Sequence, residues 1–150
     1  MKISEIMTKK AITVKKDTPV DKIAELLFGK GLTGVPVCEN EKVIGIVTEA
    51  DLVMQDARFH MPTYIQLLDS FVYFESQKHI EEELHKMLGT TALDVMTKKV
   101  ISISPDATIE DLADLIVKNH INPIPVCKNN KLVGIVSRAD LVKLLIKRKK

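Results

Sequence analysis

Two short segments each place a carboxylate three residues after a hydroxyl. They run from Thr48 to Asp51 and from Ser137 to Asp140. Each segment joins an apolar run to a helix-like pattern, so the hydroxyl would lie at a helix N-terminus, where free N–H groups and the helix dipole favour a phosphate. The carboxylate could accept hydrogen bonds from both hydroxyls of a ribose. The same spacing is also a helix capping box, which needs no ligand, and from the spacing alone capping is the favoured interpretation.

Both segments belong to an internal repeat with an offset of 89 residues (140 − 51). The sequence GIVTEAD ends at Asp51 and returns as GIVSRAD ending at Asp140. Upstream, the run Met7-Thr8-Lys9-Lys10 returns as Met96-Thr97-Lys98-Lys99 in the same register. One register held without a gap indicates a tandem duplication.

The elements that would position these residues follow the order strand, helix, strand, strand, helix in each copy. In the first copy, residues 11–14 alternate like a strand. Thr18 is expected to cap a helix with Pro19 at its first position and Asp21 as the reciprocal capping partner. Gly31 is expected to end that helix.

A hairpin and a second helix complete each copy. In the first copy, residues 34–38 and 43–47 are expected to pair around a polar turn at 39–42, with a helix at 50–54. One copy is too small to cover both faces of a three-stranded sheet, so the copies must pack together. We therefore expect an α/β (α+β) protein of two pseudo-twofold-related repeats, each a small three-stranded sheet with flanking helices.

The middle of the chain does not repeat. Residues 1–55 form repeat 1, residues 56–90 form an inserted helical segment or linker, and residues 91–150 form repeat 2 with a basic tail. Apolar stripes around Phe71 and Leu84 predict two helices in the insertion. These helices would pack on their own module, form a dimer interface or cover a ligand, and the sequence leaves the choice open.

Composition excludes several protein classes. Apolar residues make up 45% and charged residues 28% of the chain, and no apolar run is long enough to span a membrane. The N-terminus lacks the apolar core of a signal peptide, so we expect a cytoplasmic protein. A formal charge of +2 gives no reason to expect a polyanionic partner. Cys38 and Cys127 occupy equivalent positions and are expected to be small buried residues, not a disulfide or a metal site.

The repeated pattern resembles a tandem pair of CBS domains, the regulatory Bateman module. In each copy the resemblance rests on a strand and a helix, an apolar residue and proline in the next strand, and the Gly-to-Asp segment described above. The resemblance implies a pseudo-symmetric α/β disk, often a dimer of such pairs. It also implies clefts between the repeats that bind AMP, ADP, ATP or S-adenosylmethionine, with no cofactor required.

The resemblance assigns residues to those clefts. Asp51 and Asp140 would hold ribose, while Thr48 and Ser137 would approach phosphate. The apolar-Pro pairs and the strand residues before each helix would form adenine pockets. All of these positions could instead be strand ends with satisfied polar side chains. The full expected set is Ile12, Thr13, Thr33, Val35, Pro36, Thr48, Asp51, Ile101, Ser102, Asn122, Ile124, Pro125, Ser137, Arg138 and Asp140.

The two copies differ beside their hydroxyls. Arg138 can bind a phosphate, whereas Glu49 at the equivalent position repels one. This difference favours the Asp140 cleft as the stronger site, unless the phosphate lies over the opposite repeat and Arg138 serves the Asp51 ribose. His120 stands where the first copy has Gly31 and is expected to be a surface residue.

Three classes of function can be compared. The favoured one is a stand-alone sensor that binds an adenine nucleotide and acts on an unidentified regulated protein. The chain shows no nucleophile–base set, metal-spaced cluster or phosphate-binding glycine loop, so we expect no enzyme. The alternative is a structural scaffold or a nucleic-acid-binding dimer, which the scarcity of arginine disfavours. Apolar helix residues, among them Leu26, Val53, Leu115 and Val142, predict a homodimer.

Overall fold

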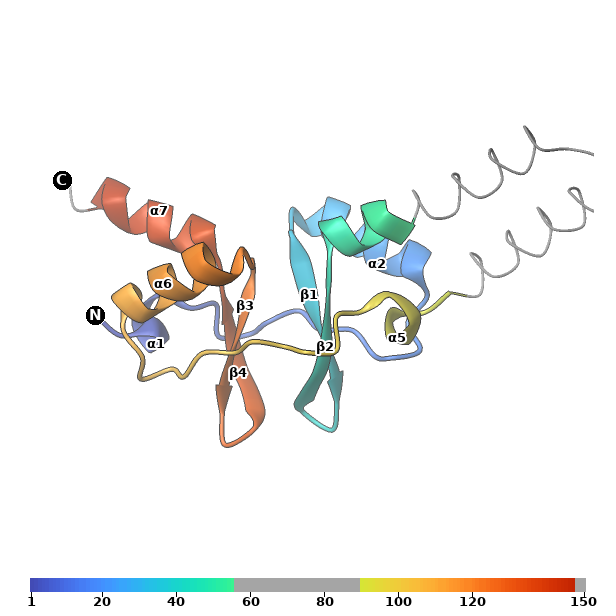
Figure 1. Ribbon diagram of the computed structural model, residues 1–150, viewed down its shortest axis with the longest axis horizontal. Helices are drawn as coiled ribbons and strands as arrows, with labels where there is room; N and C mark the ends of the chain where they lie inside the picture. Colours follow the sequence, from blue (N-terminus) through green and yellow to red (C-terminus); the bar gives the residue numbers. More distant parts are fainter. Residues whose placement is uncertain (56–89, 148–150) are drawn as a thin grey trace, which may run out of the picture.

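The computed structural model describes residues 1–55 and 90–147, which form two α/β units side by side (Figure 1). The first unit contains α2 (Val20–Lys30), β1 (Gly34–Glu39), β2 (Lys42–Thr48) and a helical segment at residues 49–55. The second contains α6 (Ile109–Asn119), β3 (Ile124–Lys128), β4 (Lys131–Val136) and α7 (Arg138–Lys147). The short helices α1 (Ile3–Ile6) and α5 (Ala92–Val95) precede the two copies. The mixed fold of two small repeats is confirmed. The expected helices around Phe71 and Leu84 lie outside the described residues.

Each unit contains one antiparallel hairpin, as the sequence predicts. β1 pairs with β2 and β3 pairs with β4, each with a register shift just before its cysteine. The turn residues Asn40 and Glu41 have φ values of 50° and 66°, and Asn129 and Asn130 have values of 50° and 62°. Two consecutive positive φ angles are typical of a type I′ turn, whose twist matches that of the two strands, and asparagine tolerates this conformation well.

Each sheet has two strands, so the expected third strand is not formed. Val14 makes only a single parallel bridge to Val37, in which its N–H donates to the carbonyl oxygen of Pro36 at 3.0 Å. The next hydrogen bond of a parallel ladder would need a donor on the backbone nitrogen of Pro36, which proline lacks. Ile103 makes the equivalent single bridge to Val126, beside Pro125. Proline therefore prevents the ladder from extending on the N-terminal side of this bridge in both repeats.

The start of α2 also differs from the expectation. Pro19, not Thr18, is the N-cap, and no side chain caps this helix. The Thr18 hydroxyl instead accepts a hydrogen bond from the Lys15 backbone N–H at 3.0 Å. In the second repeat, Thr108 stands at the position equivalent to Pro19 and forms a capping box with Asp111. Because the second repeat has Thr108 where the first has Pro19, α6 begins with a side-chain cap and α2 does not.

The two short helices are exchanged between the repeats. α1 lies against the second unit and α5 against the first (Figure 1). Ile3 is fully buried in the core that contains Leu112 and Ile124, although it precedes the first repeat in sequence. Ala92 is fully buried in the core that contains Ile23. Each apolar core is therefore completed by the short helix that precedes the other repeat in sequence.

Short backbone bridges reinforce this exchange. Thr8 pairs with Ile135 of β4, and Thr97 pairs with Ile46 of β2. The chain segments leading out of α1 and α5 therefore cross over the hairpin of the opposite repeat. The glycine of each repeated GIV sequence makes room for this crossing. A Cβ atom on Gly134 would lie 2.7 Å from Sδ of Met7 and 2.9 Å from the carbonyl oxygen of Thr8.

Candidate functional site

Both hydroxyl–carboxylate segments form capping contacts at the ends of β2 and β4. Oδ2 of Asp51 accepts hydrogen bonds from the backbone N–H of Thr48 at 2.9 Å and from its hydroxyl at 3.1 Å. Oδ2 of Asp140 accepts from the backbone N–H and hydroxyl of Ser137 at 2.8 and 3.0 Å. The capping interpretation of the spacing is therefore confirmed. One carboxylate oxygen in each segment is committed to the backbone turn.

The other carboxylate oxygens have weaker contacts. Oδ1 of Asp51 accepts from the hydroxyl of Thr97 at 3.5 Å, which is at the limit of a hydrogen bond. Oδ1 of Asp140 lies 3.8 Å from Nζ of Lys143, whose side chain is 71% exposed. An ion pair of this length whose lysine lies in solvent contributes little. Both carboxylates thus retain an oxygen that could accept a hydrogen bond from a ligand hydroxyl.

The next backbone N–H groups along the two helices already have acceptors in the protein. The Glu49 N–H donates to the carbonyl oxygen of Thr33 at 3.0 Å. The Arg138 N–H donates to Oδ1 of Asn122 at 2.8 Å. These two N–H groups are therefore not free to bind a phosphate. Side chains are further candidates to hold an anion at this place.

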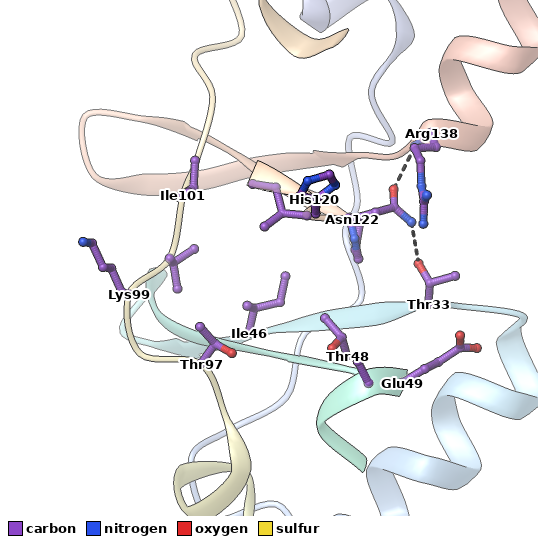
Figure 2. A pocket seen from close by; sticks show the side chains of 14 residues that line it. Thr33, Ile46, Thr48, Glu49, Thr97, Lys99, Ile101, His120, Asn122 and Arg138 are labelled. Carbon is purple, nitrogen blue, oxygen red and sulfur yellow. Dashed lines mark hydrogen bonds between the residues drawn. The ribbon is translucent and has the colours of Figure 1, made fainter. Parts of the chain in front are cut away.

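A cavity of about 330 Å³ lies between the repeats, and we call it the inter-repeat cavity. Figure 2 shows its lining side chains, which come from the end of β2 on one side and from the second repeat on the other. The lining residues are Thr33, Ile46, Thr48, Glu49, Ala50, Thr97, Lys99, Val100, Ile101, His120, Ile121, Asn122, Pro123 and Arg138. Hydroxyls, cations and aliphatic side chains are thereby combined in one place.

Part of the cavity wall is a direct contact between equivalent residues. Nδ2 of Asn122 donates to Oγ1 of Thr33 at 3.2 Å, and the two positions are 89 residues apart (Figure 2). This contact joins the pseudo-symmetric partners of the two repeats. The remaining amide oxygen of Asn122 is occupied by the Arg138 N–H, so the whole amide serves to align the start of α7 with the first repeat.

The charged residues of the cavity come unequally from the two repeats. Glu49 is the acidic group contributed by the first repeat, whereas Lys99 and Arg138 are the basic groups contributed by the second. All three are exposed, so they can reach a ligand without a large desolvation cost. Glu49 and Arg138 therefore face the same cavity and do not distinguish two separate clefts. Arg138 of the second repeat thus shares a cavity with Thr48 and Glu49 of the first repeat, as in the alternative that the sequence left open.

Other expected ligand residues do not line this cavity. Val35, Pro36, Ile124 and Pro125 are fully buried, so a ligand could reach them only through their backbone. Ile12 is 37% exposed. Of the fifteen expected positions, the cavity brings together Thr33, Thr48, Ile101, Asn122 and Arg138. Those outside its lining are Ile12, Thr13, Val35, Pro36, Asp51, Ser102, Ile124, Pro125, Ser137 and Asp140.

A second cavity of about 350 Å³ involves Thr13 and Cys38, together with Lys10 and residues of β4. Cys38 and Cys127 are free and half-buried. Burial raises the pKa of the Cys38 thiol, and the nearby Cys127 adds a smaller effect in the same direction. Burial also raises the pKa of the Cys127 thiol, against an opposing hydrogen bond with Ser102. Both thiols are therefore poor nucleophiles at neutral pH.

Sequence reasoning missed several residues of the inter-repeat cavity. Ile46, Thr97 and Lys99 come to it through the crossing of the chain over the opposite hairpin, which no local pattern shows. His120 was expected only as a surface residue, and it is exposed but also lines the cavity. The sequence signal for this position was that His120 differs from its equivalent residue, Gly31.

Among residues 1–55 and 90–147, no cluster of three or more His, Cys, Asp or Glu could hold a metal ion. The same residues contain no helix long and apolar enough to cross a membrane.

Comparison with known proteins supports the repeat architecture. The family model for the CBS domain matches residues 3–57 and again residues 92–147. The uncharacterized protein MJ1426 of Methanocaldococcus jannaschii is 36% identical over 157 aligned residues, which cover 97% of this chain and 92% of the relative. The chain spans 45% of MJ0188 from the same organism and 65% of the chloroplastic protein CBSX1 of Arabidopsis thaliana.

Solved structures agree in fold. The structure of Arabidopsis thaliana CBSX2 in complex with AMP has a TM-score of 0.75 and 25% identity, covering 99% of this chain and 98% of that chain. A putative acetoin utilization protein (AcuB) from Vibrio cholerae has a TM-score of 0.75 and 22% identity, covering 99% and 93%. The internal repeat, its two hairpins and both matches of the family model lead to one conclusion: this chain belongs to the CBS-domain family and carries a pair of such domains.

Proposed function

We propose that this protein is a regulatory module that binds an adenine nucleotide in the inter-repeat cavity. The observation that carries the proposal is the composition of that cavity. Lys99 and Arg138 supply positive charge, the threonines supply hydroxyls, and Ile46 and Ile101 supply apolar contact. A nucleotide presents the complementary groups: an anionic phosphate, polar ribose hydroxyls and a flat, largely apolar base. The relative CBSX2, with the same fold, was solved with AMP.

Individual roles follow from the contacts. Arg138 can hold two phosphate oxygens at once through its planar guanidinium, and Lys99 adds a second positive charge. Asp51 lies beside the cavity through its contact with Thr97, so its Oδ1 is the candidate acceptor for ribose hydroxyls. The ligand is AMP, ADP or ATP, or S-adenosylmethionine as a related adenosyl compound. No cofactor is required for such binding.

Isothermal calorimetry on the purified protein tests the proposal. AMP, ADP, ATP, S-adenosylmethionine and GMP should be titrated in parallel, and we expect one adenosyl compound to bind while GMP does not. Lack of heat with every adenosyl compound, together with no thermal shift, would contradict the proposal. A salt-sensitive complex with RNA in the same preparation would instead favour the nucleic-acid alternative.

The ribose role can be tested without removing the cap. Asp51→Asn keeps one oxygen for the Thr48 backbone but replaces the second acceptor with an amide that only donates. We expect this variant to weaken binding about tenfold, because a hydrogen-bonded carboxylate contributes roughly 1.5–3 kcal/mol. Asp140→Asn is the matched control and should leave binding at this cavity unchanged. Equal losses in the two variants would show that Asp51 has no special role.

We also propose that the module acts as a homodimer toward a regulated protein of the same cell. Within the part of the chain that the structure describes, apolar side chains are exposed on two helices, where Val53 and Met54 are 67% and 54% exposed and Leu145 and Ile146 are 64% and 62% exposed. Leu26 and Leu115, by contrast, pack against the cores. The uncovered residues support pairing with a second copy. Light scattering should give about twice the chain mass of 16.8 kDa, and the monomer mass at micromolar concentration would contradict the dimer.

A further inference from the structure

His120 adopts a backbone conformation that favours glycine. It is the C-cap of α6, with φ of 52° and ψ of 37° in the left-handed region. The equivalent C-cap of α2 is Gly31, with φ of 61° and ψ of 39°. Helices commonly end on a residue in this conformation, and glycine adopts it without a steric penalty because it lacks Cβ. The second repeat therefore keeps a side chain where the fold itself would favour none.

Packing does not account for the histidine. The side chain is exposed, so it contributes little to either apolar core. Non-glycine residues in this region of the backbone are strained, and such strain concentrates at functional sites. His120 is also one of the residues that line the inter-repeat cavity (Figure 2). The side chain thus lies where it can contact a ligand, at a cost to the stability of the helix end.

The cavity wall indicates which part of a ligand His120 would contact. His120, Lys99 and Arg138 all come from the second repeat and can all donate hydrogen bonds, whereas Glu49 is contributed by the first repeat. An anionic group would therefore be placed against the second repeat. The backbone N–H groups of Glu49 and Arg138 already donate within the protein, which favours contacts from side-chain donors at these positions.

We propose that His120 is a specificity-determining residue whose imidazole donates a hydrogen bond to the phosphate of the bound nucleotide. This inference rests on the proposed nucleotide-binding function. It goes further by assigning the phosphate contact to a residue that only the second repeat possesses. The residue makes the cavity prefer phosphorylated adenosine over adenosine itself.

Three variants test the assignment by calorimetry with AMP and with adenosine, alongside thermal unfolding without ligand. His120→Gly restores the residue of the first repeat, and His120→Asn keeps a short side chain that tolerates the left-handed conformation. Lys118→Gln is the control, because Lys118 lies on the same helix, pairs with Asp114 and does not line the cavity. We expect His120→Gly and His120→Asn to lose about tenfold in AMP affinity relative to adenosine, and the control to lose none.

Stability separates a binding role from a structural one. The melting temperature of His120→Gly should be equal to or higher than that of the original protein, because glycine relieves the strained helix end. An unchanged ratio of AMP to adenosine affinity would overturn the assignment, as would a clear fall in melting temperature. Absence of AMP binding by the unaltered protein would instead refute the proposed function, so the two failures are distinguishable.

Discussion

The two repeats are nearly the same in their hairpins and different at the cavity between them. β1–β2 and β3–β4 have the same antiparallel pairing and the same irregularity before the cysteine. At the cavity, Glu49 is matched by Arg138 and Gly31 by His120. The duplicated backbone therefore tolerates opposite charges at equivalent positions, because these positions are exposed and carry no part of either core.

The difference shows how one asymmetric cavity arises from two similar halves. Thr33 and Asn122 touch each other across the pseudo-twofold relation, so substitutions near them change a shared space. Residues further from this contact are divided between two cavities. Lys99 lines the inter-repeat cavity, and its equivalent Lys10 lines the second one. Divergence at a few positions near the junction is therefore enough to give one cavity its own charge pattern.

The largest effect should come from the exchanged helices. Ile3 and Ala92 are equivalent and fully buried, but they differ in size. Ile3→Ala should lower the free energy of unfolding by about 2–5 kcal/mol, because it leaves a void among Leu112 and Ile124. Ala92→Ile should cost about 1–3 kcal/mol through overpacking. Urea denaturation measures both. Ile12→Ala, at a partly exposed position, is the control, and a loss for Ile3→Ala no larger than for Ile12→Ala would contradict the exchange.

A smaller effect is expected from the opposed charges of the cavity. Arg138→Gln should weaken AMP binding about tenfold, because a charge-assisted contact is replaced by a neutral one. Glu49→Gln should leave AMP affinity unchanged or raise it severalfold, because an exposed acidic neighbour is removed. Calorimetric titration of both variants is the measurement. If both substitutions weakened AMP binding equally, the opposite charges of Glu49 and Arg138 would not explain their effects on the ligand.

Repetition and local chemistry allowed most of the fold to be predicted. The hairpin around Asn40 and the end of α2 at Gly31 follow from turn residues and apolar spacing, which act over a few neighbours, whereas the cap at the start of α2 was predicted one residue too early. The prediction of a third strand in each sheet was wrong. Pro36 interferes with a parallel ladder only where a strand lies beside it, and the sequence does not show which segment lies there. The spacing of Thr48 and Asp51 correctly predicted a capping box.

The cavity was harder to predict because its residues come together through the crossing of the chain. Both copies offer similar apolar helices, so the sequence does not show that α1 enters the core of the second repeat. The same ambiguity hid Thr97 and Lys99, which reach the cavity opposite their own hairpin. The role of Arg138 depended on that geometry too. Local spacing identified its chemistry but not the repeat that it faces.

The helix ends provide a third comparison with a smaller effect. The hydroxyl of Thr108 accepts a hydrogen bond from the Asp111 N–H at 3.2 Å, whereas α2 begins at Pro19 without a side-chain cap. Thr108→Ala should lower the free energy of unfolding by about 1 kcal/mol, the usual loss for an N-cap residue. Thr18→Ala is the matched variant in the first repeat and should cost less, because that hydroxyl caps no helix. Chemical denaturation measures both losses. A larger loss of unfolding free energy for Thr18→Ala than for Thr108→Ala would contradict the assignment of the cap to Thr108.

The smallest effect concerns pH. Hydrogen bonds from the Thr108 backbone and then from its side chain hold the pKa of Asp111 below its ordinary value of 3.8. A lowered pKa in the folded state stabilises the protein above the unfolded value, and the stabilisation disappears as the pH falls through the folded value. The difference in melting temperature between the original protein and Asp111→Asn should therefore be larger at pH 6 than at pH 3. An equal difference at both pH values would contradict the cap.

The exchange of α1 and α5 also governs the order in which the chain can fold during synthesis. Ile3 is synthesised before the rest of the core that it enters, which is built from residues 103–136. The first repeat likewise waits for Ala92, which follows it. The first repeat therefore cannot finish folding before α5 has been made, although domains usually fold in order of synthesis. Completion requires contacts between distant parts of the chain, which slow folding and make the pair a single cooperative unit.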